Sequence, residues 1–372
     1  MNLTIDASSI VSGGGLTHLI ELTNNIKSES VSIKVIASEK VLNELPNSIK
    51  KVSHPYLNKN IIKRIYFQIF ILDRLLFDTD ILFSITGDYL GGFRPLIGMS
   101  QNMLLFEREN LRGFGFEKIK FLINYQRQRI SFKKSDAIIF LSKHAQNIVE
   151  SQIDLTSKQR KIINHGVHQK FHFENDFKKN ERQNIVYVSS FHYYKNQINV
   201  IKAVNSLRVQ YPNLTLTLIG DFINKSYENK IKDAVKKYNT NNWIKIFNKI
   251  NYDRIQKFYD DADLIVFASS CENMPLILIE SMASGKPIIC SNKPPMTEFL
   301  SKKNYFFNPN EIDSIYNALL ATIKLEENEL VEISQSNKVD SIKYNWNSTA
   351  VETIKFVKHV HEVFKMKNYE TN

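Results

Sequence analysis

The chain has 372 residues, of which 43% are apolar, 11% aromatic and 23% charged. This composition excludes a wholly disordered chain, a collagen and a coiled coil, and the length predicts two domains, each with its own core. The 49 Lys and Arg residues outnumber the 38 Asp and Glu residues, so the net charge of +11 predicts attraction to an anionic partner.

Short apolar runs alternate along the chain with longer stretches of helical periodicity, which is typical of α/β proteins with parallel sheets. In the first half we predict strands over 3–5, 31–37, 80–85, 95–100, 137–141 and 161–164, and helices over 16–26, 61–77, 117–132 and 143–150. Residues 166–183 have no period, and we interpret them as the connection between two halves. In the second half we predict strands over 184–189, 214–219, 243–247, 263–268 and 287–291, and helices over 196–211, 226–238, 253–259, 276–284, 311–324, 329–336 and 348–364.

Two classes of protein are disfavoured by what the sequence contains. The two cysteines, Cys271 and Cys290, are too few for a disulfide framework and form no zinc-binding motif, so we expect a reducing compartment. Polar residues interrupt the densest apolar stretch, 65–77, and the N-terminus has no signal-peptide pattern. We expect a protein that is soluble or that lies on a membrane surface.

The sharpest chemical signal is a pair of glutamates, Glu272 and Glu280, eight positions apart. Glu272 follows a predicted buried strand, Pro275 suits the first turn of a helix, and Gly285 ends that helix. Open α/β sheets bind ligands beyond the carboxyl ends of their strands, and a helix N-terminus attracts anions. Two carboxylates beside an anion site suit a ligand with both phosphate and hydroxyl groups, such as a sugar nucleotide. The alternative is that Glu280 is a buried acid paired with a Lys or Arg.

The stretch Glu272–Pro287 resembles the glutamate–seven residues–glutamate motif of the retaining glycosyltransferases called family 4. The resemblance includes both glutamates, Ser281-Met282-Ala283 and Gly285-Lys286-Pro287. Further segments that resemble the family are 164–167, 186–196, 218–221 and 262–270, with weaker likeness at 13–18 and 99–107. The resemblance implies the GT-B fold, in which two Rossmann-like α/β domains with doubly wound parallel sheets face a cleft.

The resemblance also implies a role for each matching residue. Glu280 would hold the ribose hydroxyls, and Lys195 would face the donor diphosphate, where its charge stabilises the leaving group. Catalysis would rest on Lys195 and Glu272. The remaining donor contacts would come from Asn273, Met274, Pro275 and Leu276, which follow Glu272. They would also come from Ser190, which precedes Lys195, and from Gly14 and Gly15 in the glycine loop of the first domain.

Two features depart from the family pattern. Many relatives have an Arg shortly before the lysine, where this chain has Ser190 and His192. Many relatives also have a His in the first domain near the reacting carbon, where this chain has Gln101 and Asn102, whose amides cannot act as general bases. We expect Gln101, Asn102 and His18 to contact the acceptor. Either another group or the donor phosphate itself would accept the proton, and the resemblance implies the phosphate.

Other patterns are weaker. An Asp-x-Asp pattern, which binds a divalent metal in another glycosyltransferase fold, occurs twice, at Asp78-Thr79-Asp80 and at Asp261-Ala262-Asp263. Both occurrences lie at the start of a predicted strand, where acidic caps are common. We therefore expect no metal and no cofactor besides the nucleotide sugar. Residues 13–15 lack the glycine spacing of a dinucleotide fingerprint. Eight basic residues within 108–134 predict either a solvated helix face or a surface that rests on anionic lipid: Arg108, Arg112, Lys118, Lys120, Arg127, Arg129, Lys133 and Lys134. We expect no binding to nucleic acid.

Together these patterns predict an acceptor domain over 1–170, a nucleotide-sugar domain over 171–345 and a C-terminal helix over 346–372 that packs back on the first domain. The predicted enzyme moves a hexose from a UDP- or GDP-sugar to a hydroxyl of a lipid-linked glycan, with retention and without metal. It would act in O-antigen or capsule synthesis, in the cytoplasm and peripherally on the inner face of the membrane. Two alternatives are a GT-B sugar-nucleotide epimerase and a non-catalytic partner in polysaccharide assembly.

Overall fold

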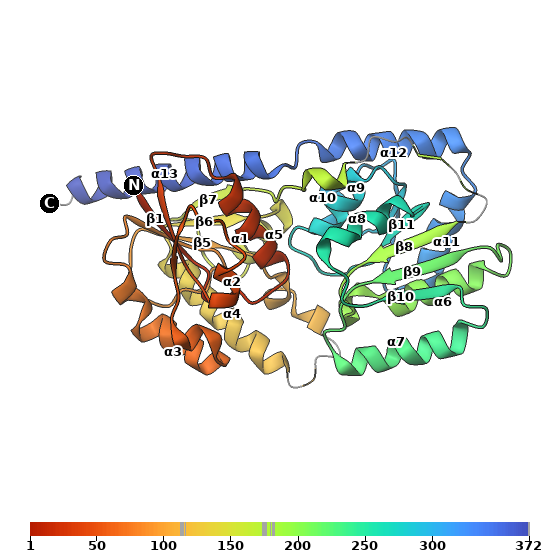
Figure 1. Ribbon diagram of the computed structural model, residues 1–372, viewed down its shortest axis with the longest axis horizontal. Coiled ribbons are helices and arrows are strands. Elements are labelled where there is room, and N and C mark those ends of the chain that lie inside the picture. Colours follow the sequence, from red (N-terminus) through yellow and green to blue (C-terminus); the bar gives the residue numbers. More distant parts are fainter. Residues whose placement is uncertain (112–114, 116, 173–176, 179, 181–182, 371–372) are drawn as a thin grey trace. The chain divides into compact units, whose positions relative to one another are not determined.

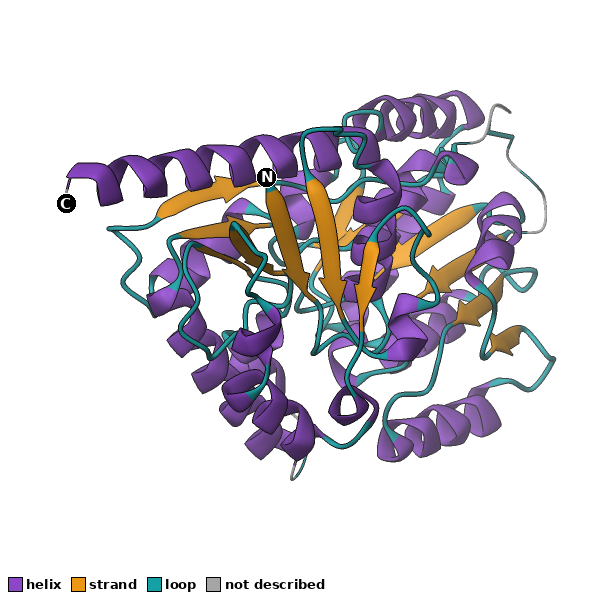
Figure 2. Cartoon of the chain, turned by 60° about the vertical axis from the view of Figure 1, so that its left-hand side comes forward, coloured by secondary structure: helices purple, strands orange, loops and turns teal. Residues whose placement is uncertain are grey.

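The computed structural model describes residues 1–111, 115, 117–172, 177–178, 180 and 183–370. The chain divides into two compact units. Unit 1 comprises Met1–Arg108, Gly115–Gly166 and Asn345–Asn372, and unit 2 comprises Glu109–Phe114 and Val167–Tyr344. Each unit is a parallel sheet with helices packed around it (Figures 1 and 2), so the predicted α/β class with two doubly wound sheets is confirmed.

Unit 1 contains a seven-stranded parallel sheet in the order β3-β2-β1-β4-β5-β6-β7. Its strands are β1 (Asn2–Asp6), β2 (Ser32–Ile36), β3 (Lys50–Val52), β4 (Ile81–Ser84), β5 (Leu96–Met99), β6 (Ala137–Phe140) and β7 (Gln159–Ile162). Its helices include α1 (Gly14–Asn25), α2 (Glu39–Leu42), α3 (Ile61–Phe70), α4 (Glu117–Lys134), α5 (Lys143–Glu150) and α13 (Trp346–Glu370). Every residue of β4, β5 and β6 is buried, as expected for central strands covered on both faces.

Unit 2 contains a six-stranded parallel sheet in the order β10-β9-β8-β11-β12-β13, which is the strand order of a Rossmann fold. Its strands are β8 (Asn184–Val188), β9 (Thr215–Ile219), β10 (Ile244–Phe247), β11 (Leu264–Phe267), β12 (Ile288–Ser291) and β13 (Tyr305–Phe307). Its helices include α6 (Gln197–Leu207), α7 (Lys225–Tyr238), α8 (Tyr252–Asp260), α9 (Leu276–Ala283), α10 (Met296–Phe299), α11 (Ile312–Ile323) and α12 (Glu327–Ser341). Helix α6 packs against α7 and α11, while α9 packs against α12.

Helix α13 belongs to unit 1 and packs against α1. At its start, the Thr349 hydroxyl donates to the Asn164 carbonyl at 2.8 Å. One turn further on, Lys161 Nζ on β7 lies 2.5 Å from a carboxylate oxygen of Glu352. In the part of the chain that the structure describes, no helix has both the length and the apolar character that a bilayer span requires.

The predicted helix over 61–77 is wrong in its second half. The helix ends at Phe70, and a 3₁₀ turn over Leu72–Leu75 follows. The turn allows the Asp73 carboxylate to accept hydrogen bonds from the Tyr89 hydroxyl and the Gly92 N–H, and it places Leu72 and Leu76 in the core. Long-range packing thus overrides the local helical period.

Other differences concern short elements. Strands β3 and β13 and helices α2 and α10 were not predicted, because three or four residues carry too little periodicity to stand out. Strand β7 begins two residues before the predicted strand over 161–164. In the connecting segment 166–183, residues 173–176, 179 and 181–182 lie outside the described residues, as does Arg112 in the basic segment.

Candidate active site at the carboxyl ends of the strands

Strands β8 and β11 lie side by side in the middle of the unit 2 sheet, where the strand order reverses. The loops that follow two such strands lead away in opposite directions and leave a crevice between them. The Ser270 N–H donates to the Tyr194 carbonyl at 2.8 Å, and the Asn196 amide donates to the Ala268 carbonyl at 2.9 Å. These hydrogen bonds connect the loop after β8 to the loop after β11.

The two loops bring Lys195 and Glu272 into an ion pair, although 77 residues separate them. Their side chains are only 7% and 15% exposed, so solvent screens the pair weakly. The Tyr187 hydroxyl donates to the Lys195 carbonyl at 2.8 Å and fixes the backbone of the lysine. The two residues that the resemblance assigns to catalysis are therefore adjacent.

Helix α9 starts directly beyond this ion pair. Its N-cap is Pro275, which has no side-chain group that could cap the first turn. Asn273 and Met274 are buried in the loop between Glu272 and the helix, and Leu276 is the first helical residue. Ser190 lies in the loop after β8, and its carbonyl accepts a hydrogen bond from the Gln197 amide at 2.9 Å. All the predicted donor-binding residues of unit 2 thus follow β8 or β11.

Glu280 is the fifth residue of α9 and is 4% exposed. Side chains in a helix tilt toward its N-terminus, which directs this carboxylate back toward the loops. Burial raises the pKa of Glu280 to about 7, although hydrogen bonding from Tyr252 acts in the opposite direction. The Tyr252 hydroxyl donates to Glu280 Oε1 at 2.6 Å. Among the described residues Glu280 therefore forms its hydrogen bond with a tyrosine, and no Lys or Arg forms an ion pair with it.

Tyr252 and Lys170 were missed by the sequence analysis. The Lys170 ammonium lies 3.9 Å from the centre of the Tyr252 ring and 2.8 Å from a carboxylate oxygen of Asp253. Through this arrangement Lys170 contributes a favourable charge near Glu280. No spacing rule links a residue of the connecting segment to the first residue of α8, so the sequence carries no signal for this cluster.

Unit 1 brings together some of its predicted residues. Gly13 precedes α1 with a φ of 77°, and a Cβ added to Gly15 would lie 2.8 Å from Gln101 Oε1. The loops after β1 and β5 therefore meet, and Gly15 permits the close approach. Gly14 is the first residue of α1, and the Asn102 side chain caps a 3₁₀ turn by accepting from the Leu104 N–H at 3.1 Å.

His18 lies in the interior of unit 1 and has no exposed surface. Its Nδ1 lies 2.8 Å from Nδ1 of His165, and its ring packs edge-on against Trp346. Burial lowers the pKa of His18 to about 3, so the ring is neutral. These contacts give His18 a packing role, and the acceptor contact stays a prediction.

The structure adds a polar cluster at the point where the strand order of unit 1 reverses, between β1 and β4. Asp88 lies 2.8 Å from Arg127 and accepts a hydrogen bond from the Ser9 hydroxyl at 2.6 Å. Burial, followed by the charge of Asp88, raises the pKa of the nearby Asp6 to about 6. In the sequence Arg127 stands out only as one of eight basic residues, and neither acid belongs to a recognisable motif.

The two aspartate pairs have structural partners. Hydrogen bonds from Lys34 and Lys50 hold the pKa of Asp78 at about 2, and Asp80 accepts from the Asn2 N–H at 2.7 Å. Asp263 accepts from the Asn184 N–H at 2.7 Å. Within the described residues, no group of three or more His, Cys, Asp or Glu side chains could hold a metal ion.

Comparisons with known proteins show what the chain is similar to. Residues 168–339 match the model of glycosyl transferases group 1. The chain is 26% identical over 161 residues to a lipopolysaccharide 1,2-N-acetylglucosaminetransferase of Salmonella typhimurium, a match that covers 41% of this chain and 42% of that protein. The first curated relatives are each matched over less than two thirds of their length.

Solved structures resemble the chain over nearly its whole length. Sucrose-phosphate synthase of Thermosynechococcus elongatus has a TM-score of 0.80 at 13% identity, covering 98% of this chain and 100% of that one. Anabaena Alr3699/HepE, solved in complex with UDP-glucose, has a TM-score of 0.72 at 15% identity, covering 95% and 99%. At this identity the likeness shows the fold, which is GT-B. Lys195, Glu272 and Glu280 all lie within the segment that matches the model of glycosyl transferases group 1.

Proposed function

We propose that the protein is a retaining, metal-independent glycosyltransferase of family 4 that uses a nucleotide-diphosphate sugar to glycosylate a lipid-linked glycan in O-antigen or capsule synthesis. The observation that carries the proposal is the buried ion pair between Lys195 and Glu272 at the strand reversal of a group 1 domain. Relatives named for lipopolysaccharide and O-antigen synthesis, and a structural neighbour solved with UDP-glucose, support the choice of substrates. Neither the epimerase nor the non-catalytic alternative gains support from these findings.

The ion pair suits a donor with phosphate and hydroxyl groups. Without ligand, Lys195 and Glu272 neutralise each other in a weakly solvated place. A sugar nucleotide replaces this contact with two others: its diphosphate takes the ammonium, and its sugar hydroxyls donate to the carboxylate. The uncapped first turn of α9 adds the positive end of a helix dipole. Both charges stay paired, so the exchange avoids leaving a buried ion alone.

The reaction breaks the bond between the anomeric carbon and the diphosphate oxygen. Negative charge grows on the departing diphosphate, and Lys195 stabilises that charge. The acceptor hydroxyl forms the new bond on the same face of the sugar, and its proton passes to the departing diphosphate. Glu272 holds the sugar during this exchange, while Glu280 and Tyr252 hold the ribose.

Thermal stabilisation by a panel of UDP- and GDP-sugars tests donor binding. A ligand at 100 times its Kd adds about 2.7 kcal/mol to the free energy of unfolding. Glu280→Ala should respond less than the wild type to the best ligand, whereas Glu332→Ala should respond equally, because Glu332 is an exposed acid of the same unit. An undiminished response of Glu280→Ala would refute the ribose assignment.

The stereochemistry and the metal requirement need separate measurements. NMR of the product should show the anomeric configuration of the donor, and an inverted centre would refute retention. Turnover should continue in EDTA, and its loss with recovery on adding a divalent cation would refute metal independence.

We also propose that unit 1 rests on an anionic lipid surface. After Ile61, the exposed first residue of α3, the exposed apolar residues of that helix are Ile62, Tyr66, Ile69 and Phe70, and on α4 they are Ile119, Leu122, Ile123 and Ile130. These spacings place each set on one side of its helix. A hydrogen bond between Arg127 and Gln68 joins the two helices. Lys63, Lys118 and Lys120 are exposed beside these sets, so the surface combines apolar side chains with positive charge.

Flotation with vesicles of phosphatidylcholine and phosphatidylglycerol tests this surface. The double variant Ile62→Ser, Phe70→Ser should bind the vesicles weakly. The control is Val209→Ser, which alters a still more exposed apolar residue of unit 2 (86% exposed) and should bind like the wild type. Binding that ignores the double substitution, or that is unaffected by salt, would refute the proposal.

A further inference from the structure

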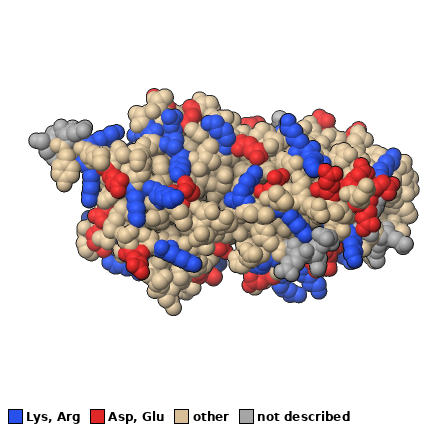
Figure 3. Space-filling model, turned by 90° about the horizontal axis from the view of Figure 1, so that it is seen from above, with Lys and Arg blue, Asp and Glu red and all other residues tan. Residues whose placement is uncertain are grey.

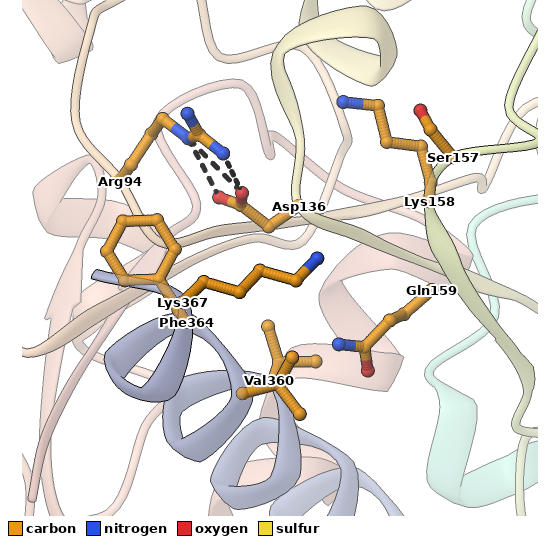
Figure 4. A pocket seen from close by; sticks show the side chains of 9 residues that line it. Arg94, Asp136, Ser157, Lys158, Gln159, Val360, Phe364 and Lys367 are labelled. Atoms are coloured by element: carbon orange, nitrogen blue, oxygen red, sulfur yellow. Dashed lines mark hydrogen bonds and ion pairs between the residues drawn. The ribbon is translucent and has the colours of Figure 1, made fainter. Parts of the chain in front are cut away.

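Many of the ion pairs lie at the surface of the protein, where solvent weakens them. Lys and Arg side chains are spread over the face shown in Figure 3, with acidic side chains beside several of them. Arg94 of unit 1, for example, is exposed and pairs with Asp136 through two of its nitrogens (Figure 4). Lys170 of unit 2 differs, because its side chain is only 18% exposed and its ammonium lies over an aromatic ring. Solvent therefore screens the charge of Lys170 less.

A short 3₁₀ turn places Lys170 beside helix α9. The turn spans Gln169–Phe171, and His168 caps it, because its Nδ1 accepts from the Lys170 N–H at 3.1 Å. The turn packs against α9. The ring of Phe171 has no exposed surface, and its centre lies 5.5 Å from the centre of the Tyr252 ring on α8. Packing on two helices thus gives the backbone of Lys170 a defined position.

The Lys170 ammonium lies over the side chain that orients Glu280. It is 3.9 Å from the centre of the Tyr252 ring, a distance at which a cation is attracted to the face of an aromatic ring. A rotation of the ring away from Lys170 would lose that attraction. The hydroxyl of the same tyrosine donates to Glu280 Oε1 at 2.6 Å. Lys170 therefore fixes the group that holds the Glu280 carboxylate.

The groups that act on the charge of Glu280 come from α8 and from the 3₁₀ turn. Burial raises the pKa of Glu280, whereas three neighbours lower it: first the hydrogen bond from Tyr252, then the charge of Lys170, then a hydrogen bond from Tyr259. Helix α12 also packs against α9, and its Lys338 lies against the glycine that follows the C-terminus of α9. The Glu280 carboxylate is directed toward the other end of that helix. Lys170 is thus the cation among the neighbours of Glu280.

We propose that Lys170 is a positioning residue for the ribose of the donor: it holds the Tyr252 ring in place and supplies positive charge near the carboxylate of Glu280. The proposal rests on the proposed function, because it requires a nucleotide whose ribose lies at Glu280. Lys170 does not touch the nucleotide and acts through its two neighbours. A ribose hydroxyl donates a stronger hydrogen bond to a charged carboxylate than to a neutral one, so both effects of Lys170 favour nucleotide binding.

Isothermal titration calorimetry of the full chain with UDP, GDP and their 2′,3′-dideoxy analogues tests the proposal. The analogues keep the base and the diphosphate and lack the ribose hydroxyls. Lys170→Met keeps the length of the side chain and removes its charge. It should weaken the binding of the preferred nucleotide about two- to thirtyfold, the range of a cation–π contact, and leave the dideoxy analogue unchanged. Lys170→Gln, which is also neutral, should give the same result.

Three further variants separate a specific role from general effects. Lys170→Arg keeps the charge and stacks on an aromatic face, so it should restore most of the affinity. Lys303→Met removes an exposed, paired lysine from another part of unit 2 and should bind like the wild type. Tyr252→Phe removes the hydroxyl through which Lys170 acts. Adding Lys170→Met to Tyr252→Phe should therefore cost less affinity than Lys170→Met costs in the wild type.

The pH dependence provides a readout that packing alone would not change. The ratio of the affinities for a nucleotide and its dideoxy analogue cancels the titration of the diphosphate, which both carry. In the wild type this ratio should rise between about pH 6 and 8, as Glu280, with a pKa of about 7, becomes charged. In Lys170→Met the rise should move to higher pH, because the charge that favours the carboxylate is gone. Asp253 also loses its ion pair, but it titrates below this range.

The outcomes distinguish the role of Lys170 from the donor site itself. If the wild type binds neither UDP nor GDP, the proposed function fails and the role of Lys170 fails with it. If the wild type binds and Lys170→Met binds equally well, the role of Lys170 alone is overturned. Equal weakening of a nucleotide and its dideoxy analogue would show general attraction of anions and overturn it too, as would a Lys170→Arg variant that binds as weakly as Lys170→Met.

Discussion

Replacing Glu280 with Gln should make the unliganded protein more stable at neutral and alkaline pH while weakening nucleotide binding. The side chain keeps its size and an oxygen that accepts from the Tyr252 hydroxyl, but it loses the charge. Burial is the largest influence on Glu280, and it disfavours the charged form. The wild type retains this buried charge because the proposed ribose contact requires a strong acceptor.

The magnitude follows from the pKa, which rises from 4.5 in the unfolded chain to about 7 in the folded protein. At roughly 1.4 kcal/mol per pKa unit, ionised Glu280 costs about 3 kcal/mol of folding free energy. Between pH 4.5 and 7 the folded state binds more protons than the unfolded state, so the stability of the wild type falls as the pH rises through this window. Glu280→Gln does not titrate, so its advantage grows across the same window and is constant above pH 7.

Urea unfolding of both proteins from pH 4.5 to 8.5 measures this difference. The two free energies of unfolding should be similar at pH 4.5 and should differ by about 2–3 kcal/mol at pH 8.5, with the variant more stable. Thermal shifts with saturating UDP at pH 8.5 should be smaller for the variant. Two results would refute the assignment of a buried carboxylate at Glu280: a variant that is less stable than the wild type at pH 8.5, or a difference between the two free energies of unfolding that does not change with pH.

Three further outcomes are expected. Lys195→Ala should lower kcat/KM by about 10²–10³, measured as nucleotide release from the best donor, because one charge that stabilises the leaving group is lost; an unchanged rate would contradict its role. Leu72→Ala should lower the free energy of unfolding by about 2–5 kcal/mol in urea, since Leu72 has no exposed surface; a loss below 1 kcal/mol would contradict the packing. Gly166→Ala should cost about 1–3 kcal/mol, because its Cβ would lie 2.2 Å from the backbone nitrogen of Trp346, whereas Gly92→Ala, with its nearest atom at 3.9 Å, should be neutral; equal effects would contradict this close contact.

Much of the fold could be predicted from local pattern. Buried central strands such as β6 and β11 are continuous apolar runs, and the helices between the strands have a clear period. The boundary between the units falls at Gly166 and Val167, at the start of the segment 166–183 that we interpreted as the connection between the two halves. Glu272 and Glu280 could be paired because one helix and its preceding loop hold both, so their separation in sequence predicts their separation in space.

The rest depended on contacts between distant segments. The sequence predicts Lys195 and Glu272 separately, but their ion pair exists because β8 and β11 are neighbours, and strand order is decided by the packing of the whole sheet. The hydrogen bond from the Tyr252 hydroxyl to Glu280 has no periodic signal, because it depends on where α8 packs against α9. Local chemistry thus determined which side chains were available for the site, and tertiary structure alone decided which of them meet and how far water is excluded around them.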